Sequence, residues 1–159
     1  MSRTPLRTTP SREEVCSRHE PLRLRLPEPG AAEELEAYFA AFTPVTFVNS
    51  VVVHELLVGA RTPAKAKQVR EDLVGPLIRA RRVITPSHGS WERAGEALAT
   101  MAREESRDLR TVPKSLVHDF LLAASCRESG VTLITDNSAD FSLVQKYVDL
   151  HWIEPWPAG

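Results

Sequence analysis

The hydrophobic pattern is clearest between residues 116 and 141, which read LVHDFLLAASCRESGVTLITDNSADF. Apolar residues recur there every three to four positions and predict a helix that ends at Gly130. Residues 131–135 are mostly apolar or β-branched and predict a short strand, followed by an acidic turn with Asp136 and Asp140. Ligands bind beyond the carboxyl ends of strands in open α/β sheets, so this turn is a candidate site.

Asp119 interrupts the apolar face of the predicted helix. Removing a carboxylate from water costs on the order of several kcal/mol unless a partner compensates its charge. A carboxylate on a core-facing surface, with more acids at a nearby strand end, indicates a shared cation. The neighbours of Asp119 on the same helix face are Leu116, Leu122, Ala123 and Cys126.

Alternating helical and strand patterns continue through most of the chain. This alternation predicts an α/β fold with a parallel sheet covered by helices. Asn49 and Ser50 are good N-cap residues for the second predicted helix, and Pro113 suits a first helical turn. The predicted helices span 31–42, 51–58, 63–79, 91–107 and 142–147, and further strands span 82–86 and 150–153.

Residues 1–30 do not share this pattern. They contain five prolines, six arginines and few large apolar residues. Proline at this density breaks regular structure, so we expect an atypical, disordered arm before a domain over 31–157. Only residues 22–26 alternate like a strand, and prolines close that segment on both sides.

Composition narrows the class of protein. The chain has 159 residues, 42% of them hydrophobic, and a formal net charge of −1, which fits one domain without a global attraction to nucleic acid. No apolar run approaches the roughly 18 residues of a membrane span, and no secretory signal is present. The two cysteines lack a metal-ligand spacing and suit reduced thiols. We therefore expect a cytoplasmic protein without a membrane partner.

A local positive patch could still contact nucleic acid. Seven Lys or Arg residues and two acids lie between Arg61 and Arg82. This stretch is either a solvated helix face or a surface that contacts phosphates.

Four acids are candidates for chemistry: Glu55, Asp119, Asp136 and Asp140. Carboxylate oxygens without a His or Cys ligand spacing suit a hard cation, Mg²⁺ or Mn²⁺. Such an ion can polarise a phosphoryl oxygen and activate water. Alternatively, Asp136 and Asp140 serve as turn and N-cap residues, and Glu55 pairs with an arginine of the basic stretch.

Two histidines stand beside these acids in the sequence. His54 precedes Glu55, and His118 precedes Asp119. A helix turns adjacent residues about 100° apart, so we expect both histidines to point away from the acids.

Three segments together resemble a PIN domain, specifically the toxin ribonuclease of VapBC-type toxin–antitoxin pairs. The resemblance implies a PIN-like α/β/α sandwich and an Mg²⁺-dependent endoribonuclease that cleaves RNA. It also implies a cognate antitoxin that neutralises the toxin, and a homodimer. The matching segments are SVVVHELLVG at 50–59, HDFLLAA at 118–124 and TDNSADF at 135–141.

The resemblance also implies roles for the acids. Glu55 and Asp119 match acids of the family's metal site. The fourth acidic position falls on Asn137 or Asp140, with Asp136 beside it, and we prefer Asp140. The implied catalytic residues are therefore Glu55, Asp119 and Asp140, with Asp136 as a further metal ligand.

One departure concerns the N-terminus. The family begins with an apolar strand that ends in an aspartate, but residues 10–20 contain no aspartate and no apolar strand, and the first aspartate is Asp72. We therefore expect the N-terminal strand to be atypical or missing, and the metal to lack a principal ligand. Residues 22–26 could take the strand position and bring Glu28 near the site. A shifted reading frame or a wrong start would also explain the mismatch.

The departure leaves other functions open. The alternative to a ribonuclease is a catalytically impaired PIN-like protein that only binds antitoxin or RNA. A third class is an α/β scaffold protein, in which Asp119→Leu would be stabilising and Mg²⁺ would leave the melting temperature unchanged.

Overall fold

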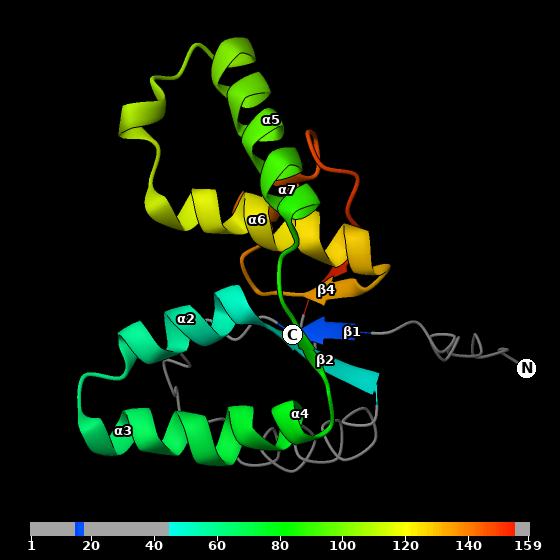
Figure 1. Cartoon of the computed structure of the whole chain (residues 1–159). Helices are drawn as coiled ribbons and strands as arrows, with labels where there is room; N and C mark the ends of the chain where they lie inside the picture. The colour runs from blue at the N-terminus through cyan, green and yellow to red at the C-terminus, as the bar shows by residue number, and fades with distance from the viewer. Residues whose placement is uncertain (1–14, 18–44, 155–159) are drawn as a thin grey trace, which may run out of the picture.

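The structure is a computed structural model that describes residues 15–17 and 45–154. The helix expected at 31–42 lies outside these residues. The described elements alternate between strands and helices, which confirms the expected α/β class (Figure 1). In chain order they are β1 (Val15–Ser17), β2 (Thr46–Asn49), α2 (Ser50–Gly59), α3 (Pro63–Gln68), η2 (Val69–Val74), α4 (Gly75–Arg79), β3 (Val83–Ile84), α5 (His88–Glu104), η3 (Leu109–Thr111), α6 (Lys114–Ser129), β4 (Thr132–Ile134), α7 (Ser138–Val144) and β5 (Trp152–Ile153).

The five strands form one parallel sheet in the order β3-β2-β1-β4-β5. The central strand is β1, in which Cys16 pairs with Phe47 on one side and Leu133 on the other. The expectation of no strand at 10–20 is therefore wrong. The suggestion that residues 22–26 occupy the central position is also wrong, because β1 holds it. β1 is atypical all the same, since its three residues include no carboxylate.

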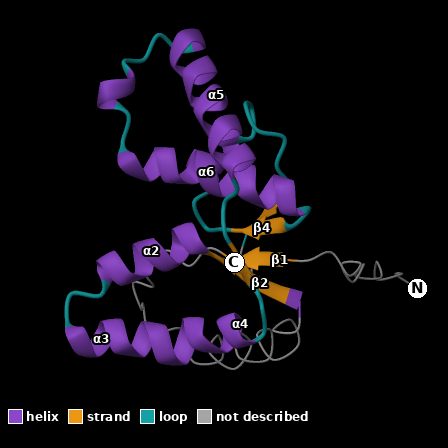
Figure 2. Cartoon of the chain, in the orientation of Figure 1, coloured by secondary structure: helices purple, strands orange, loops and turns teal. Residues whose placement is uncertain are grey.

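The helices gather in two groups beside the sheet. The segment from α2 to α4 carries the chain from β2 to β3, as a parallel pair requires a crossover. It lies on the β2 side of the strands, whereas α5 and α6 lie on the β4 side (Figure 2). Because every strand pair is parallel, the carboxyl ends of the strands face one edge of the sheet.

The helix expected at 63–79 forms, but it is not uniform. Thr62 caps α3, and Pro63 occupies its first turn. The middle third, η2, is π-helical, and the N–H of Gly75 bonds to the carbonyl of Arg70. A Cβ on residue 75 would lie 2.9 Å from that carbonyl oxygen, so the π turn requires glycine.

The core lies between α5, α6 and the sheet. α5 contributes Ala97, Leu98 and Met101, all buried. α6 is buried over most of its length, which explains why its sequence is apolar on nearly every side. It ends at Gly130, whose φ of 67° is left-handed, as the glycine in the sequence predicted.

The last helix begins earlier than the sequence pattern indicated. We expected a helix at 142–147, but α7 spans Ser138–Val144. The cause is Asn137, whose side chain accepts a hydrogen bond from the N–H of Asp140 and caps the helix. Asp140 is therefore a first-turn helical residue, not the end of a turn.

Within residues 15–17 and 45–154, none of the helices combines the length and the apolar character that crossing a membrane requires.

Candidate functional site at the carboxyl edge of the sheet

The carboxyl ends of β2 and β4 are level with each other. Ser17 pairs with Val48 on one side and with Ile134 on the other, so Asn49 and Thr135 each lie one residue further along. Both are buried, at 0% and 1% exposure. The acids that follow these two strands therefore start from the same edge of the sheet.

Asp119 lies on α6, the helix that precedes β4 in the chain. The short turn at Gly130 reverses the chain, so that β4 runs back along α6. Asp119 precedes that turn by eleven residues, or about 16 Å of helix. Its side chain is fully buried at 0% exposure, and the four apolar neighbours expected on its helix face are buried too. The sequence prediction of a carboxylate inside the apolar face is confirmed.

Glu55 and His118 connect α2 to α6. The Nδ1 atom of His118 lies 3.3 Å from Oε1 of Glu55, and the two side chains are 33% and 18% exposed. The ring of His54 contacts the ring of His118 edge to face, with 5.5 Å between their centres. Our expectation that both histidines point away from the acids is therefore wrong for His118. The helices cross so that residue 118 faces Glu55.

A further link to α6, this one from β2, was not predicted from the sequence. The Nδ2 atom of Asn49 donates a hydrogen bond of 2.6 Å to Oγ of Ser125, and both residues are buried. The Oδ1 atom of the same side chain accepts from the N–H of Val51, 3.0 Å away, and caps α2. The capping role followed from the sequence, but the bond to Ser125 joins residues 76 positions apart.

The turn after β4 is held by its own polar groups. The hydroxyl of Thr135 accepts from the N–H of Asn137, and the Nδ2 atom of Asn137 donates to Oδ2 of Asp140 at 2.8 Å. This bond fixes the Asp140 carboxylate against the start of α7. Asp136 is exposed and contributes a backbone carbonyl to the N–H of Ser138.

The four candidate acids do not form a complete ligand group within the described part of the chain. No three His, Cys, Asp or Glu side chains there are placed to hold a metal ion together. The residue brought into contact with Glu55 is His118, the neighbour of Asp119 in α6. Asp140 and Asp136 belong to the separate polar turn after β4.

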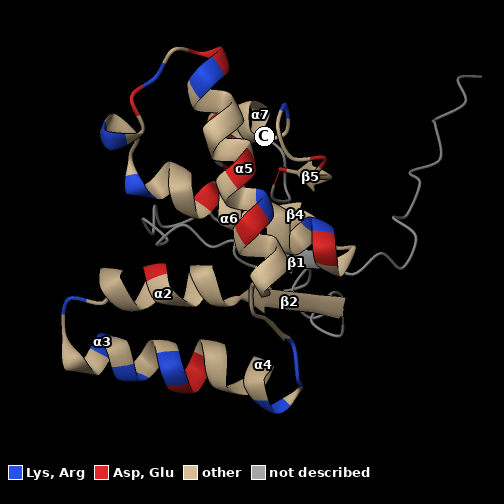
Figure 3. Ribbon diagram, turned by 45° about the horizontal axis from the view of Figure 1, so that its top comes forward, with Lys and Arg blue, Asp and Glu red and all other residues tan. Residues whose placement is uncertain are grey.

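The predicted basic stretch forms an exposed band along α3, η2 and α4. Blue segments of ribbon, which mark Lys and Arg, recur along these helices in Figure 3, with red acidic segments between them. The acids of this stretch are Glu71 and Asp72. One of the acids pairs within the band, since Lys67 lies 3.9 Å from Glu71. The exposed cations are Arg61, Lys65, Lys67, Arg70, Arg79 and Arg81.

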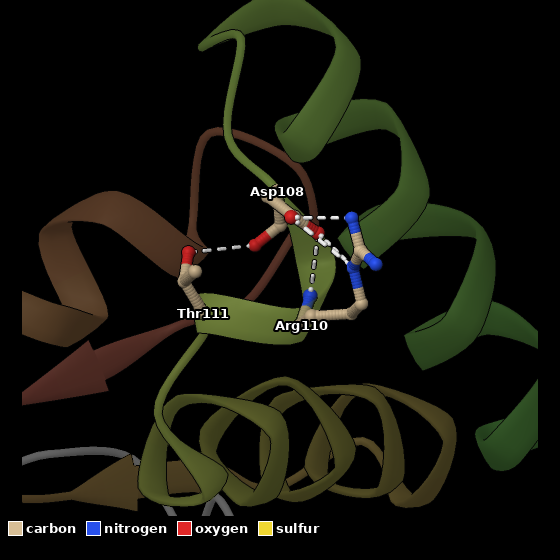
Figure 4. A network of polar contacts seen from close by, with 3 residues as sticks. All are labelled: Asp108, Arg110 and Thr111. Atoms are coloured by element: carbon tan, nitrogen blue, oxygen red, sulfur yellow. Dashed lines mark hydrogen bonds and ion pairs between the residues drawn. The ribbon is translucent and has the colours of Figure 1, made fainter.

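A polar network shapes the approach to α6. Asp108 accepts hydrogen bonds from the N–H and the guanidinium of Arg110, and its carbonyl accepts from the hydroxyl of Thr111 (Figure 4). The Arg110 guanidinium, and then its backbone N–H, lower the pKa of Asp108 below its ordinary value. Asp108 thereby caps η3, which leads the chain into the first turn of α6.

Comparison with known proteins identifies the fold. No family model matches the sequence, and no curated protein is similar to it. The structure resembles FitAcB from Neisseria gonorrhoeae, with 16% identity, a TM-score of 0.59, and 90% of this chain and 99% of that chain covered. It also resembles DNA-bound VapBC from Salmonella typhimurium, with 17% identity, a TM-score of 0.57, and 79% and 87% covered.

A third solved structure agrees with these two. VapBC-1 from nontypeable Haemophilus influenzae is 16% identical, with a TM-score of 0.56 and 88% and 96% of the two chains covered. At such low identity the likeness shows the fold alone. The fold is the PIN-like α/β arrangement expected from the three sequence segments.

Proposed function

We propose that this chain is an endoribonuclease toxin of a toxin–antitoxin pair, with its active site at the carboxyl edge of the sheet. The observation that carries the proposal is Asp119, a fully buried carboxylate on α6 whose neighbour His118 contacts Glu55. Burying a carboxylate without a functional reason is costly. The PIN-like fold and the likeness to the VapBC and FitAB structures support the same reading.

The candidate residues offer carboxylate oxygens, the donor type that suits Mg²⁺ or Mn²⁺, although the described residues form no group of three ligands. Mg²⁺ keeps several waters and is commonly bound by one or two carboxylates together with substrate phosphates. Asp119 and Glu55 would be those carboxylates, with Asp140 and Asp136 on the β4 side as outer ligands. When bound, the ion would polarise the phosphoryl oxygen and lower the pKa of a coordinated water.

The protein's own groups prepare the site for that chemistry. The Asn137 amide holds the Asp140 carboxylate in one orientation, which suits a group that positions the attacking water. Buried Asn49 and Ser125 lock the start of α2 to α6 and so limit movement of Glu55 relative to Asp119. The exposed cations of α3, η2 and α4 would contact RNA phosphates, which carry no sequence information.

The partners follow from the same proposal. A toxin of this kind requires a cognate antitoxin, and we propose that this chain is cytoplasmic, binds one, and forms a homodimer. The similar structures support the antitoxin partner, because they are VapBC and FitAB complexes.

Cleavage of total RNA by the purified chain tests the proposal. We expect fragmentation in the presence of Mg²⁺, none with a chelator, and none with Asp119→Asn, which keeps the size of the side chain but removes its charge. Equal fragmentation by wild type and Asp119→Asn would attribute the activity to a contaminant and refute the proposed site.

A second function is favoured by two observations. β1 contains no carboxylate, and no three-ligand group forms in the described residues. A binding protein without catalysis would account for both. It predicts that RNA or antitoxin binds with undiminished affinity to Asp119→Asn, and that no preparation cleaves RNA.

A further inference from the structure

We propose that His118 is a positioning residue that fixes the side chain of Glu55. This inference rests on the proposed function, in which Glu55 is a metal-site acid. It adds a residue that the sequence reading had set aside, and it arises from the contact between Nδ1 of His118 and Oε1 of Glu55 at 3.3 Å.

The helical geometry separates the roles of residues 118 and 119. Adjacent residues on a helix point about 100° apart, so one turn of α6 presents two side chains to two surroundings. Asp119 faces the core and is fully buried, while His118 remains 33% exposed and faces α2. One short segment of α6 thus supplies an acid and the group that orients the other acid.

The contact suits one tautomer of the His118 ring. An ionised carboxylate can only accept hydrogen bonds, so the geometry fits the form of His118 that carries a hydrogen on Nδ1. A histidine oriented through one nitrogen holds its partner in a fixed plane, as outer partners of metal-binding groups commonly do.

His54 restricts the His118 ring in turn. The two rings meet edge to face at an angle of 86°, an arrangement that aromatic rings favour. Because His54 and Glu55 are neighbours on α2, the same helix both limits the rotation of the His118 ring and receives its hydrogen bond. The three side chains therefore form one unit, His54–His118–Glu55.

Positioning has a measurable consequence for the site. Glu55 has three rotatable side-chain bonds and is only partly buried, so each contact on its carboxylate restricts the rotamers that it samples. Losing an outer partner of this kind commonly reduces metal affinity or activity about 10- to 100-fold. We expect that loss to appear in kcat, with KM for RNA nearly unchanged.

Three variants of the full chain separate positioning from simple helix packing. His118→Leu removes the donor but keeps an apolar contact with α2. His118→Asn places an amide N–H close to the position of Nδ1, whereas His118→Gln places its amide N–H further from the backbone. The matched control is His88→Leu, because His88 also lies 3.3 Å from a glutamate, Glu92, but on the exposed start of α5.

The deciding measurement is the rotamer of Glu55, read from three-bond NMR couplings without metal or RNA. We expect one χ1 rotamer in wild type, His118→Asn and His88→Leu, and averaged couplings in His118→Leu and His118→Gln. A single rotamer in His118→Leu, or averaging already in wild type, would overturn the proposal.

Metal binding and catalysis are then measured on the same variants. Mn²⁺ affinity and kcat should fall about 10- to 100-fold in His118→Leu and recover in His118→Asn. An unchanged Mn²⁺ affinity in His118→Leu would refute the link to the metal site. If wild type cleaves no RNA, the proposed function fails, and the rotamer measurement still decides the positioning role.

Discussion

Asn49 offers the sharpest test of how the carboxyl edge is held together. Its side chain makes two buried contacts, one to the backbone N–H of Val51 and one to the hydroxyl of Ser125. Asn49→Ala removes both at once. Because Asn49 caps the start of α2, the substitution loosens the helix that carries Glu55.

The two contacts set the size of the effect. An N-cap side chain stabilises by about 1 kcal/mol on average. A buried side-chain hydrogen bond contributes about 1 kcal/mol, and its loss also leaves the Ser125 hydroxyl with one partner fewer. We therefore expect Asn49→Ala to lower the free energy of unfolding by roughly 2 kcal/mol.

Thr62→Ala is the matched control, since Thr62 caps α3 through the N–H of Lys65 but is exposed and makes no buried bond across the fold. It should cost about 1 kcal/mol or less. Urea unfolding followed by circular dichroism measures both variants, and a double-mutant cycle with Ser125→Ala should give a coupling of about 1 kcal/mol between Asn49 and Ser125. The reasoning is refuted if Asn49→Ala is no more destabilising than Thr62→Ala, or if the coupling is zero.

Three more predictions concern pH, the core and RNA. The Ser87 and Ser90 hydroxyls lower the pKa of Glu128 from its ordinary value of 4.5, so the stability they provide is present above that value and is lost as the pH falls below it. Melting temperatures from pH 7 down to pH 3 should accordingly fall less steeply in Glu128→Gln than in wild type; parallel curves would contradict this. Phe120→Ala should lower the free energy of unfolding by about 3–5 kcal/mol in the same urea assay, because Phe120 is completely buried, and a loss under 1 kcal/mol would contradict its place in the core. Lys65→Glu with Arg79→Glu should weaken RNA binding and flatten its dependence on salt concentration, whereas an unchanged salt dependence would show that the band on α3, η2 and α4 is only a solvated surface.

The elements that were predicted best from the sequence are long and have clear ends. α6 followed from its apolar period and the glycine after it, and the burial of Asp119 followed from its position within that period. The parallel sheet followed from the alternation of strands and helices. Local chemistry and periodicity are sufficient in these cases, because each signal extends over many residues.

The remaining features depend on contacts between distant segments. β1 has three residues, too few to show a period, and it is a strand because β2 and β4 pair with it on both sides. The start of α7 depended on choosing between several polar residues that could cap a helix, and Asn137 was not the one expected. The contact of His118 with Glu55 depends on how α2 crosses α6, which neither helix encodes by itself.

Metal binding tests the central claim, that Glu55 and Asp119 belong to one site for Mg²⁺ or Mn²⁺. The measurement is Mn²⁺ titration by calorimetry on the full chain, with Asp119→Asn and Glu55→Gln. We expect wild type to bind one ion and each substitution to weaken binding at least about tenfold. Equal affinity in all three proteins, or no binding by wild type, would contradict the account.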